Sequence, residues 1–203
     1  MQKKYFITGI STEVGKTVVA AIVTEALEAD YWKPIQAGEL ENSDTHKVVR
    51  FISNKKTVFH QNSYALKTPM SPHAAAEIDG ITVDLKEIQE PKTDNHLVIE
   101  GAGGLLAPIN DTTTILDLIQ PNYKVIVVSR HYLGSINHTL LTVNLLKEKG
   151  FEVAIIFSDD EHKTTESIIK KMTNITILGN IDEEPYFDKN VIKEYADKFK
   201  ELL

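Results

Sequence analysis

The part of the sequence that most constrains the fold is a glycine-containing loop between an apolar run and an amphipathic segment. Residues 4–8 read K-Y-F-I-T, which is typical of a β-strand, and residues 9–17 read G-I-S-T-E-V-G-K-T. Apolar residues then recur at helical spacing over 18–27. A strand that turns through glycines directly into a helix presents consecutive backbone N–H groups and the positive end of a helix dipole, and both attract an anion. The arrangement predicts a phosphate-binding strand–loop–helix unit.

The spacing of this loop departs by one residue from the usual phosphate-loop pattern. That pattern places four residues between its first Gly and the final Gly-Lys pair, whereas five lie between Gly9 and Gly15. A purely structural turn is the alternative, but the flanking strand and helix favour phosphate binding. Lys16 then offers a positive charge to phosphate oxygens. Thr17 offers a hydroxyl to a magnesium ion, which prefers oxygen ligands.

Further apolar runs suggest a parallel sheet. They are nearly continuous rather than alternating, as expected for strands buried on both faces. Amphipathic helical patterns lie between or after them. We therefore predict one α/β domain over residues 1–203, a P-loop NTPase-like fold with a mostly parallel sheet flanked by helices. The runs are 96–100, 124–128, 152–157 and 175–178, and the clearest helical patterns are 135–149, closed by Gly150, and 189–203.

The middle of the chain is less regular. Residues 42–52 suggest a helix capped by Asn42 or Ser43, with Val48, Val49 and Ile52 facing inward. A proline-opened helix is expected within 69–77, and one or two helical turns within 84–89.

Composition narrows the possible partners and compartment. The 203 residues carry a formal net charge of −7 without a basic block, which argues against a nucleic-acid partner. The chain has no Cys, which excludes thiolate catalysis and a disulfide framework and fits a reducing compartment. No stretch approaches the roughly 18 apolar residues of a membrane span. We expect a soluble, cytoplasmic protein without a membrane partner.

Three other segments have residues suited to chemistry. Lys33-Pro34 stands at the end of a second predicted strand. A functional role for Lys33 is one interpretation, and a solvated Lys is the simpler one. Glu100, followed by Gly101-Ala102-Gly103-Gly104, is expected at a strand tip opposite the phosphate loop, where a carboxylate suits magnesium. The alternative is a tight structural turn, which would explain the glycines but not the carboxylate. Gly134-Ser135-Ile136-Asn137 opens a helix, where capping by Ser135 and binding of a carboxylate are the alternatives.

Taken together, these segments resemble the dethiobiotin synthetase family, over residue 4 to about residue 157. The long form of the phosphate loop in T-G-I-S-T-E-V-G-K-T is similar to that of the family. The other similar segments are Lys33-Pro34, Asn42-Ser43-Asp44, Ser71-Pro72-His73, Glu100–Gly104 and Leu133–His138.

The resemblance implies a homodimeric enzyme that uses ATP, magnesium and carbon dioxide to close the ureido ring of dethiobiotin from 7,8-diaminononanoate. It implies that Lys16 and Lys33 are catalytic and that Thr17, Asp44 and Glu100 hold magnesium. The nucleotide would contact these residues and others: Thr12, Glu13, Val14, Gly15, Lys16, Thr17, Val18, Asp44, Glu100, Gly101, Ala102, Gly103 and Ser158. The diamine would contact Thr12, Lys33 and Ala37, and its carboxylate would bind Gly134, Ser135, Ile136 and Asn137, across the dimer interface.

The chain departs from the family at two positions near these sites. Ala37 stands where the family has Ser or Thr near the substrate, which removes one hydrogen bond worth roughly 0.5–1.5 kcal/mol. Phe157-Ser158-Asp159 stands where the family has an Asn that recognises the base, and 179–185 matches only loosely. The rival hypotheses are a ParA/MinD-like ATPase switch and a non-catalytic nucleotide-binding module. The absence of Lys within Ile10-Ser11-Thr12 argues against the first, and Lys33 with Glu100 against the second.

Overall fold

A seven-stranded parallel sheet forms the centre of the computed structural model, which describes residues 2–203. The strand order is β4-β2-β6-β1-β7-β8-β9, and each neighbouring pair is parallel. The predicted α/β class and parallel sheet are confirmed. The strands are β1 (Lys4–Gly9), β2 (Asp30–Trp32), β4 (Phe59–His60), β6 (Leu97–Gly104), β7 (Lys124–Arg130), β8 (Glu152–Ser158) and β9 (Thr176–Ile181).

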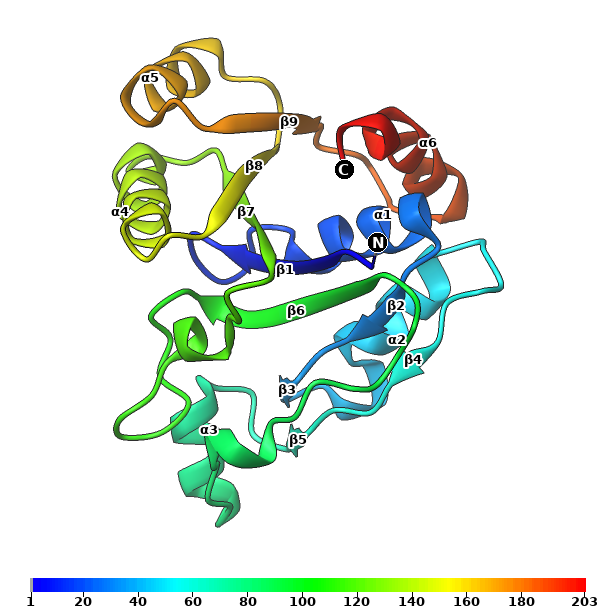
Figure 1. Cartoon of the computed structure of the whole chain (residues 1–203), viewed down its shortest axis with the longest axis vertical. Helices are drawn as coiled ribbons and strands as arrows, with labels where there is room; N and C mark the ends of the chain where they lie inside the picture. The colour runs from blue at the N-terminus through cyan, green and yellow to red at the C-terminus, as the bar shows by residue number, and fades with distance from the viewer. Residues whose placement is uncertain (1) are drawn as a thin grey trace.

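Helices cover both faces of the sheet (Figure 1). One group packs around α1 and the other lies on the opposite side, beside β7 and β8. The first group is α1 (Lys16–Leu27), α2 (Asp44–Phe51) and α6 (Lys189–Phe199), and the second is α4 (Ser135–Glu148) and α5 (Lys163–Thr173). A small parallel sheet of β3 (Ile35–Ala37) and β5 (Tyr64–Leu66) contacts β6, and α3 (Pro72–Asp79) packs against this small sheet. Short 3-10 turns are Leu40–Asn42, Leu85–Glu87, Ile115–Leu118 and Lys200–Leu202.

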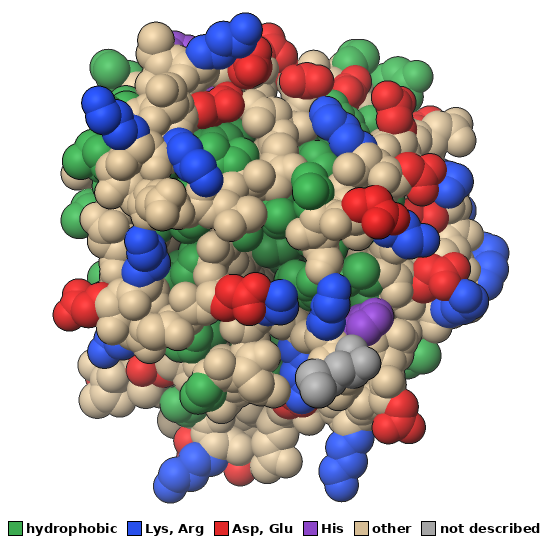
Figure 2. Space-filling model, turned by 45° about the horizontal axis from the view of Figure 1, so that its top comes forward, with side chains coloured by type: hydrophobic (Ala, Val, Ile, Leu, Met, Phe, Trp, Pro, Cys, Tyr) green, Lys and Arg blue, Asp and Glu red, His purple; other side chains and the backbone are tan. Residues whose placement is uncertain are grey.

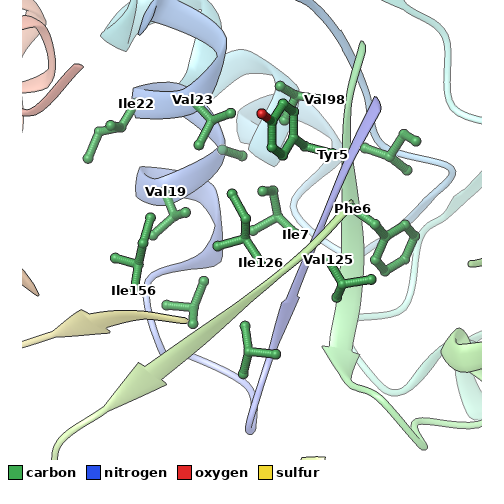
Figure 3. Packing of buried hydrophobic residues seen from close by; sticks show 14 of the residues in the cluster. Tyr5, Phe6, Ile7, Val19, Ile22, Val23, Val98, Val125, Ile126 and Ile156 are labelled. Carbon is green, nitrogen blue, oxygen red and sulfur yellow. The ribbon is translucent and has the colours of Figure 1, made fainter. Parts of the chain in front are cut away.

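The core lies on both sides of β1, because successive side chains of a strand point to opposite faces. Ile7 lies on the α1 side of the sheet with Val19 and Val23, whereas Phe6 points to the other face (Figure 3). Phe6 stacks on Tyr123, with ring centroids 6.4 Å apart. Burial on both faces explains why the strand runs are continuously apolar.

Several predicted boundaries need correction. The glycines after Glu100 do not form a turn: β6 continues through them to Gly104, so Glu100 lies inside a strand rather than at its tip. Val49 is 46% exposed and does not face inward, unlike Val48 and Ile52. The last predicted helix ends at Phe199 and continues as a 3-10 turn.

Three of the less regular predictions are confirmed. Ser43 caps α2, its hydroxyl accepting from the His46 N–H. Pro72 opens α3, and Asp84–Gln89 contains a single 3-10 turn.

Basic and acidic side chains are interspersed on the face drawn in Figure 2. No helix within residues 2–203 has the length and apolarity needed to cross a bilayer.

Candidate active site

The phosphate loop folds tightly over the end of β1. A Cβ at Gly9 would lie 2.6 Å from Val14 Cγ2 and 2.8 Å from the Ser11 carbonyl oxygen, so only glycine permits this path. Gly15 has φ +93°, in the left-handed region, and leads directly into α1. The Lys16 ammonium donates to the Ser11 carbonyl at 2.9 Å, and the residue as a whole is 8% exposed. Lys16 therefore lies folded over its own loop, where the loop N–H groups meet the helix start.

The environment of Lys16 weakens its hold on its proton. Burial, together with the nearby Lys33 ammonium, lowers the pKa of Lys16 to about 8. An anion bound in the loop would favour the charged form and raise this pKa again.

Glu100 is the centre of a buried network. Its side chain is 1% exposed. Its Oε1 atom accepts from the Thr17 hydroxyl at 2.9 Å and from the Lys33 ammonium at 3.0 Å. Its Oε2 atom accepts from the Tyr31 hydroxyl at 2.8 Å. Parallel pairing of β2 with β6 and of β6 with β1 brings these groups together.

Lys33 joins Glu100 to Asp44, the first residue of α2. Its ammonium lies 2.8 Å from Asp44 Oδ2, and its side chain is 4% exposed. Burial alone would lower the pKa of Lys33, but the Glu100 and Asp44 carboxylates hold it above its usual value. Burial would raise the pKa of Asp44, and the Lys33 charge lowers it. Lys33 is therefore not the solvated surface Lys that was the simpler interpretation of the sequence.

These groups line a cleft of about 720 Å³ between the phosphate loop, α2 and the Gly-rich end of β6. Most of the sequence-predicted nucleotide and substrate residues meet here. They are Thr12, Glu13, Gly15, Lys16, Thr17, Val18, Lys33, Ala37, Asp44, Glu100, Ala102 and Gly103. Gly101 lies just behind, with its carbonyl 3.4 Å from the Lys33 ammonium.

A second hollow of about 220 Å³ adjoins the other side of the phosphate loop. Val14 and Ser158 line it, together with Arg130 and Asp159, which pair at 2.7 Å. The Ser158 hydroxyl donates to the Val14 carbonyl at 2.8 Å and so ties β8 to the loop. Acidic residues 182–184 also line this hollow.

Residues 134–137 line neither hollow in the part of the chain that the structure describes. Gly134, with φ +101°, is the N-cap of α4, and Ser135 is its first helical residue. No side chain of residues 2–203 caps this helix start, so the predicted cap by Ser135 is wrong.

The donor set of the cleft suits a hard divalent cation. Asp44 and Glu100 present oxygens that already converge on one positive charge, the Lys33 ammonium, and the Thr17 hydroxyl lies beside them. Two carboxylates and two ammonium groups balance formally, so this set leaves the charge of a triphosphate uncompensated. Over residues 2–203 no three His, Asp or Glu side chains cluster as metal ligands, so phosphate and water oxygens would complete the coordination.

Sequence reasoning missed two buried side chains of this network. Tyr31 lies two residues before Lys33, and in a strand such residues share a face, so the spacing could have revealed it. Gln36 accepts from the Asp44 N–H at 3.2 Å and donates to the Gly38 carbonyl at 3.0 Å. Nothing in the sequence indicates the contact of Gln36 with Asp44, because it depends on how β3 meets α2.

Known proteins resemble this chain over its whole length. A family described as an AAA domain matches residues 3–191. An ATP-dependent dethiobiotin synthetase of Christiangramia forsetii is 63% identical, over 100% of this chain and 99% of that protein. Another ATP-dependent dethiobiotin synthetase, of Cytophaga hutchinsonii, is 48% identical, over 97% of this chain and 96% of that protein.

Solved structures resemble it in fold. A plasmid partition protein from Borrelia burgdorferi has a TM-score of 0.60 and 11% identity, over 99% of this chain and 97% of that one. The MinC:MinD cell division complex of Aquifex aeolicus has a TM-score of 0.56 and 16% identity, over 98% of this chain and 95% of that one. At such identities the likeness extends to the fold alone.

Proposed function

Because the chain belongs to the ATP-dependent dethiobiotin synthetase family, we propose that it closes the ureido ring of dethiobiotin from 7,8-diaminononanoate and carbon dioxide, with ATP and magnesium. The observation that carries the proposal is Lys33. Its ammonium is buried and held by two carboxylates, and a Lys that serves only solubility would be exposed, which supports a role in phosphoryl chemistry.

The reaction has three steps. One substrate amine adds to carbon dioxide and loses a proton, giving a carbamate. A carbamate oxygen attacks the γ-phosphorus of ATP, and ADP leaves. The second amine attacks the carbon of the resulting mixed anhydride, loses a proton and expels phosphate, which closes the ring.

The protein contributes charge and position. Lys16 and Lys33 would stabilise the negative charge on the transferring phosphoryl group. Thr17, Asp44 and Glu100 would hold magnesium, which neutralises phosphate oxygens when bound. The N–H groups of the loop would orient the triphosphate, and the second hollow beside Val14 and Ser158 offers room for the nucleoside.

We assign the substrate carboxylate to residues 134–137 of a second copy of the chain. The positive end of the α4 dipole attracts an anion, and these residues line neither hollow of their own chain. Leu133, immediately before them, is 105% exposed, and Leu106 is 61% exposed, as expected for side chains that a partner covers. The enzyme would thus be a homodimer, in the cytoplasm, where ATP is supplied.

A ParA/MinD-like switch is the alternative that the fold alone would permit. The phosphate loop has Ile10-Ser11-Thr12 where those proteins carry an additional Lys. We therefore keep the synthetase assignment.

The direct test is incorporation of label from bicarbonate into an acid-stable product. Purified enzyme is incubated with diaminononanoate, ATP, magnesium and labelled bicarbonate, and the product is identified by mass. The wild type should form a labelled ring product, and Lys16→Ala should form none while unfolding at a similar temperature. Absence of labelled product with the wild type, or full product with Lys16→Ala, would refute the assignment.

A further inference from the structure

Tyr31 is a buried residue to which the proposed reaction gives no role. It lies in β2, between β4 and β6, and is 0% exposed. Its ring packs against Phe59, with centroids 5.9 Å apart and planes at 55°. Its register partner in β6 is Val98, two residues before Glu100 and on the same face of the strand. The ring is therefore fixed from both neighbouring strands.

The Tyr31 hydroxyl donates to Oε2 of Glu100, the carboxylate oxygen that receives no hydrogen bond from Thr17 or Lys33. Oε1 receives the two donors that line the cleft, Thr17 and Lys33. Oε2 receives the Tyr31 hydroxyl at 2.8 Å, and both partners are buried. A carboxylate held at both oxygens cannot rotate about its last bond without breaking a hydrogen bond in a dry environment.

From this geometry we infer that Tyr31 is a positioning residue for the metal site: it fixes the Glu100 carboxylate so that Oε1 alone faces the divalent cation. The inference rests on the proposed function, in which Glu100 is a magnesium ligand. Partners behind a ligand commonly set metal affinity, and their loss costs about 10–100-fold. In Tyr31→Phe, Oε2 would have no donor, and the carboxylate could turn away from the cleft.

The test measures metal binding directly, without turnover. Mn²⁺ replaces Mg²⁺ because its free form gives an electron paramagnetic resonance signal, and a non-hydrolysable ATP analogue saturates the enzyme. We expect the Mn²⁺ dissociation constant of Tyr31→Phe to rise about tenfold. Affinity for the analogue without metal should stay within about twofold. Incorporation of 4-aminophenylalanine at position 31, which restores a donor on the same ring, should recover most of the lost affinity.

Tyr5→Phe is the matched control. It also deletes a buried tyrosine hydroxyl opposite the same residue of β6, Val98, but this hydroxyl donates to the Leu203 carbonyl at 2.7 Å instead of to Glu100. It should leave the Mn²⁺ dissociation constant unchanged, and thermal unfolding of both variants reports any general loss of stability.

The outcomes separate the inference from the assignment beneath it. An unchanged Mn²⁺ dissociation constant in Tyr31→Phe, alongside a large rise in Glu100→Gln, would overturn the role of Tyr31 only. An equal loss in Tyr31→Phe and Tyr5→Phe, or no rescue by 4-aminophenylalanine, would do the same. No Mn²⁺ binding by the wild type, or no effect of Glu100→Gln, would remove the metal assignment together with the inference.

Discussion

At the scale of single residues, the proposed function gives the ammonium of Lys33 the role of stabilising charge on the transferring phosphoryl group. This ammonium contacts both Asp44 and Glu100, so a neutral side chain there leaves two buried carboxylates facing each other. We expect Lys33→Gln to lower the turnover number and the specificity constant for ATP together, because the lost interaction belongs to the transition state. Steady-state kinetics over a range of ATP concentrations measures this. A change confined to the Michaelis constant would show that Lys33 only binds substrate.

Ala37 offers a gain-of-function prediction at the same scale. It lines the cleft beside Lys33 and carries no hydrogen-bonding group. Ala37→Thr should add one hydrogen bond toward the diamine and lower its Michaelis constant about two- to tenfold. The Michaelis constant for ATP should not change. A higher Michaelis constant for the diamine would mean that the added side chain obstructs the substrate.

The sequence allowed the main charged residues of the site to be predicted, but not their partners. Lys16 and Glu100 were expected to meet because the carboxyl ends of parallel strands converge, and Lys33 was expected to join them only from the family resemblance. Their mutual contacts depend on register. The pairing of Tyr31 with Val98 and of Ile7 with Glu100 aligns the strands so that Tyr31, Lys33 and Thr17 all reach one carboxylate. Periodicity within one strand contains no information on that alignment.

At the scale of elements, Glu25 links α1 to the segment after α2. Its carboxylate accepts from the N–H groups of Ser53 and Asn54 at 2.9 and 3.0 Å, and from both side chains. Burial would raise the pKa of Glu25, but these hydrogen bonds hold it below its ordinary value of 4.5. A lowered folded-state pKa stabilises the fold above pH 4.5, and that contribution is lost as the pH falls through the folded-state value.

Glu25→Gln should therefore lower the free energy of unfolding at pH 7 by about 2 kcal/mol, since hydrogen bonds to a charged group are lost. The difference from the wild type should shrink as the pH is lowered below 4.5 and through the lowered folded-state pKa of Glu25. Urea unfolding of both proteins at several pH values measures this difference in the free energy of unfolding. Glu28→Gln, which removes an exposed pair with Lys56 at the same helix end, is the control and should cost less than about 1 kcal/mol. A pH-independent difference would contradict the account of Glu25.

The positions of β1, β2, β6, β7, β8 and β9 and of α1, α2, α3, α4 and α6 were predictable, whereas β3, β4, β5, α5 and some element ends were not. Apolar runs predicted β1, β6, β7, β8 and β9 because buried parallel strands need them. The continuation of β6 through three glycines is decided by pairing across the sheet: Gly104 opposes Gly9, and a Cβ at Gly101 would lie 3.1 Å from the Phe6 ring. The start of α4 likewise depends on the left-handed Gly134 rather than on a cap by Ser135.

At the scale of the whole molecule, the proposed second copy has a measurable consequence. Leu133→Asp with Leu106→Asp places charges on exposed apolar positions that a partner would cover. We expect this variant to sediment as a monomer, to bind ATP like the wild type and to lose affinity for the diamine. Met172→Asp, a comparably exposed change on α5, should leave the dimer intact.

A diamine analogue without the carboxylate separates the anchor from other effects of dissociation. The wild type should bind this analogue more weakly than it binds the diamine. The monomeric variant should bind the analogue as well as the wild type binds it. Equal affinity of dimer and monomer for the diamine would place the carboxylate anchor within one chain.

The central claim is that ATP cleavage in this cleft is coupled to carboxylation of a diamine. Phosphate release from ATP, measured with diaminononanoate and bicarbonate each present or absent, tests it most directly. We predict rapid release only when both are present, with one phosphate released for each ring closed. Release at the same rate without the diamine, or none with both substrates present, would contradict the claim.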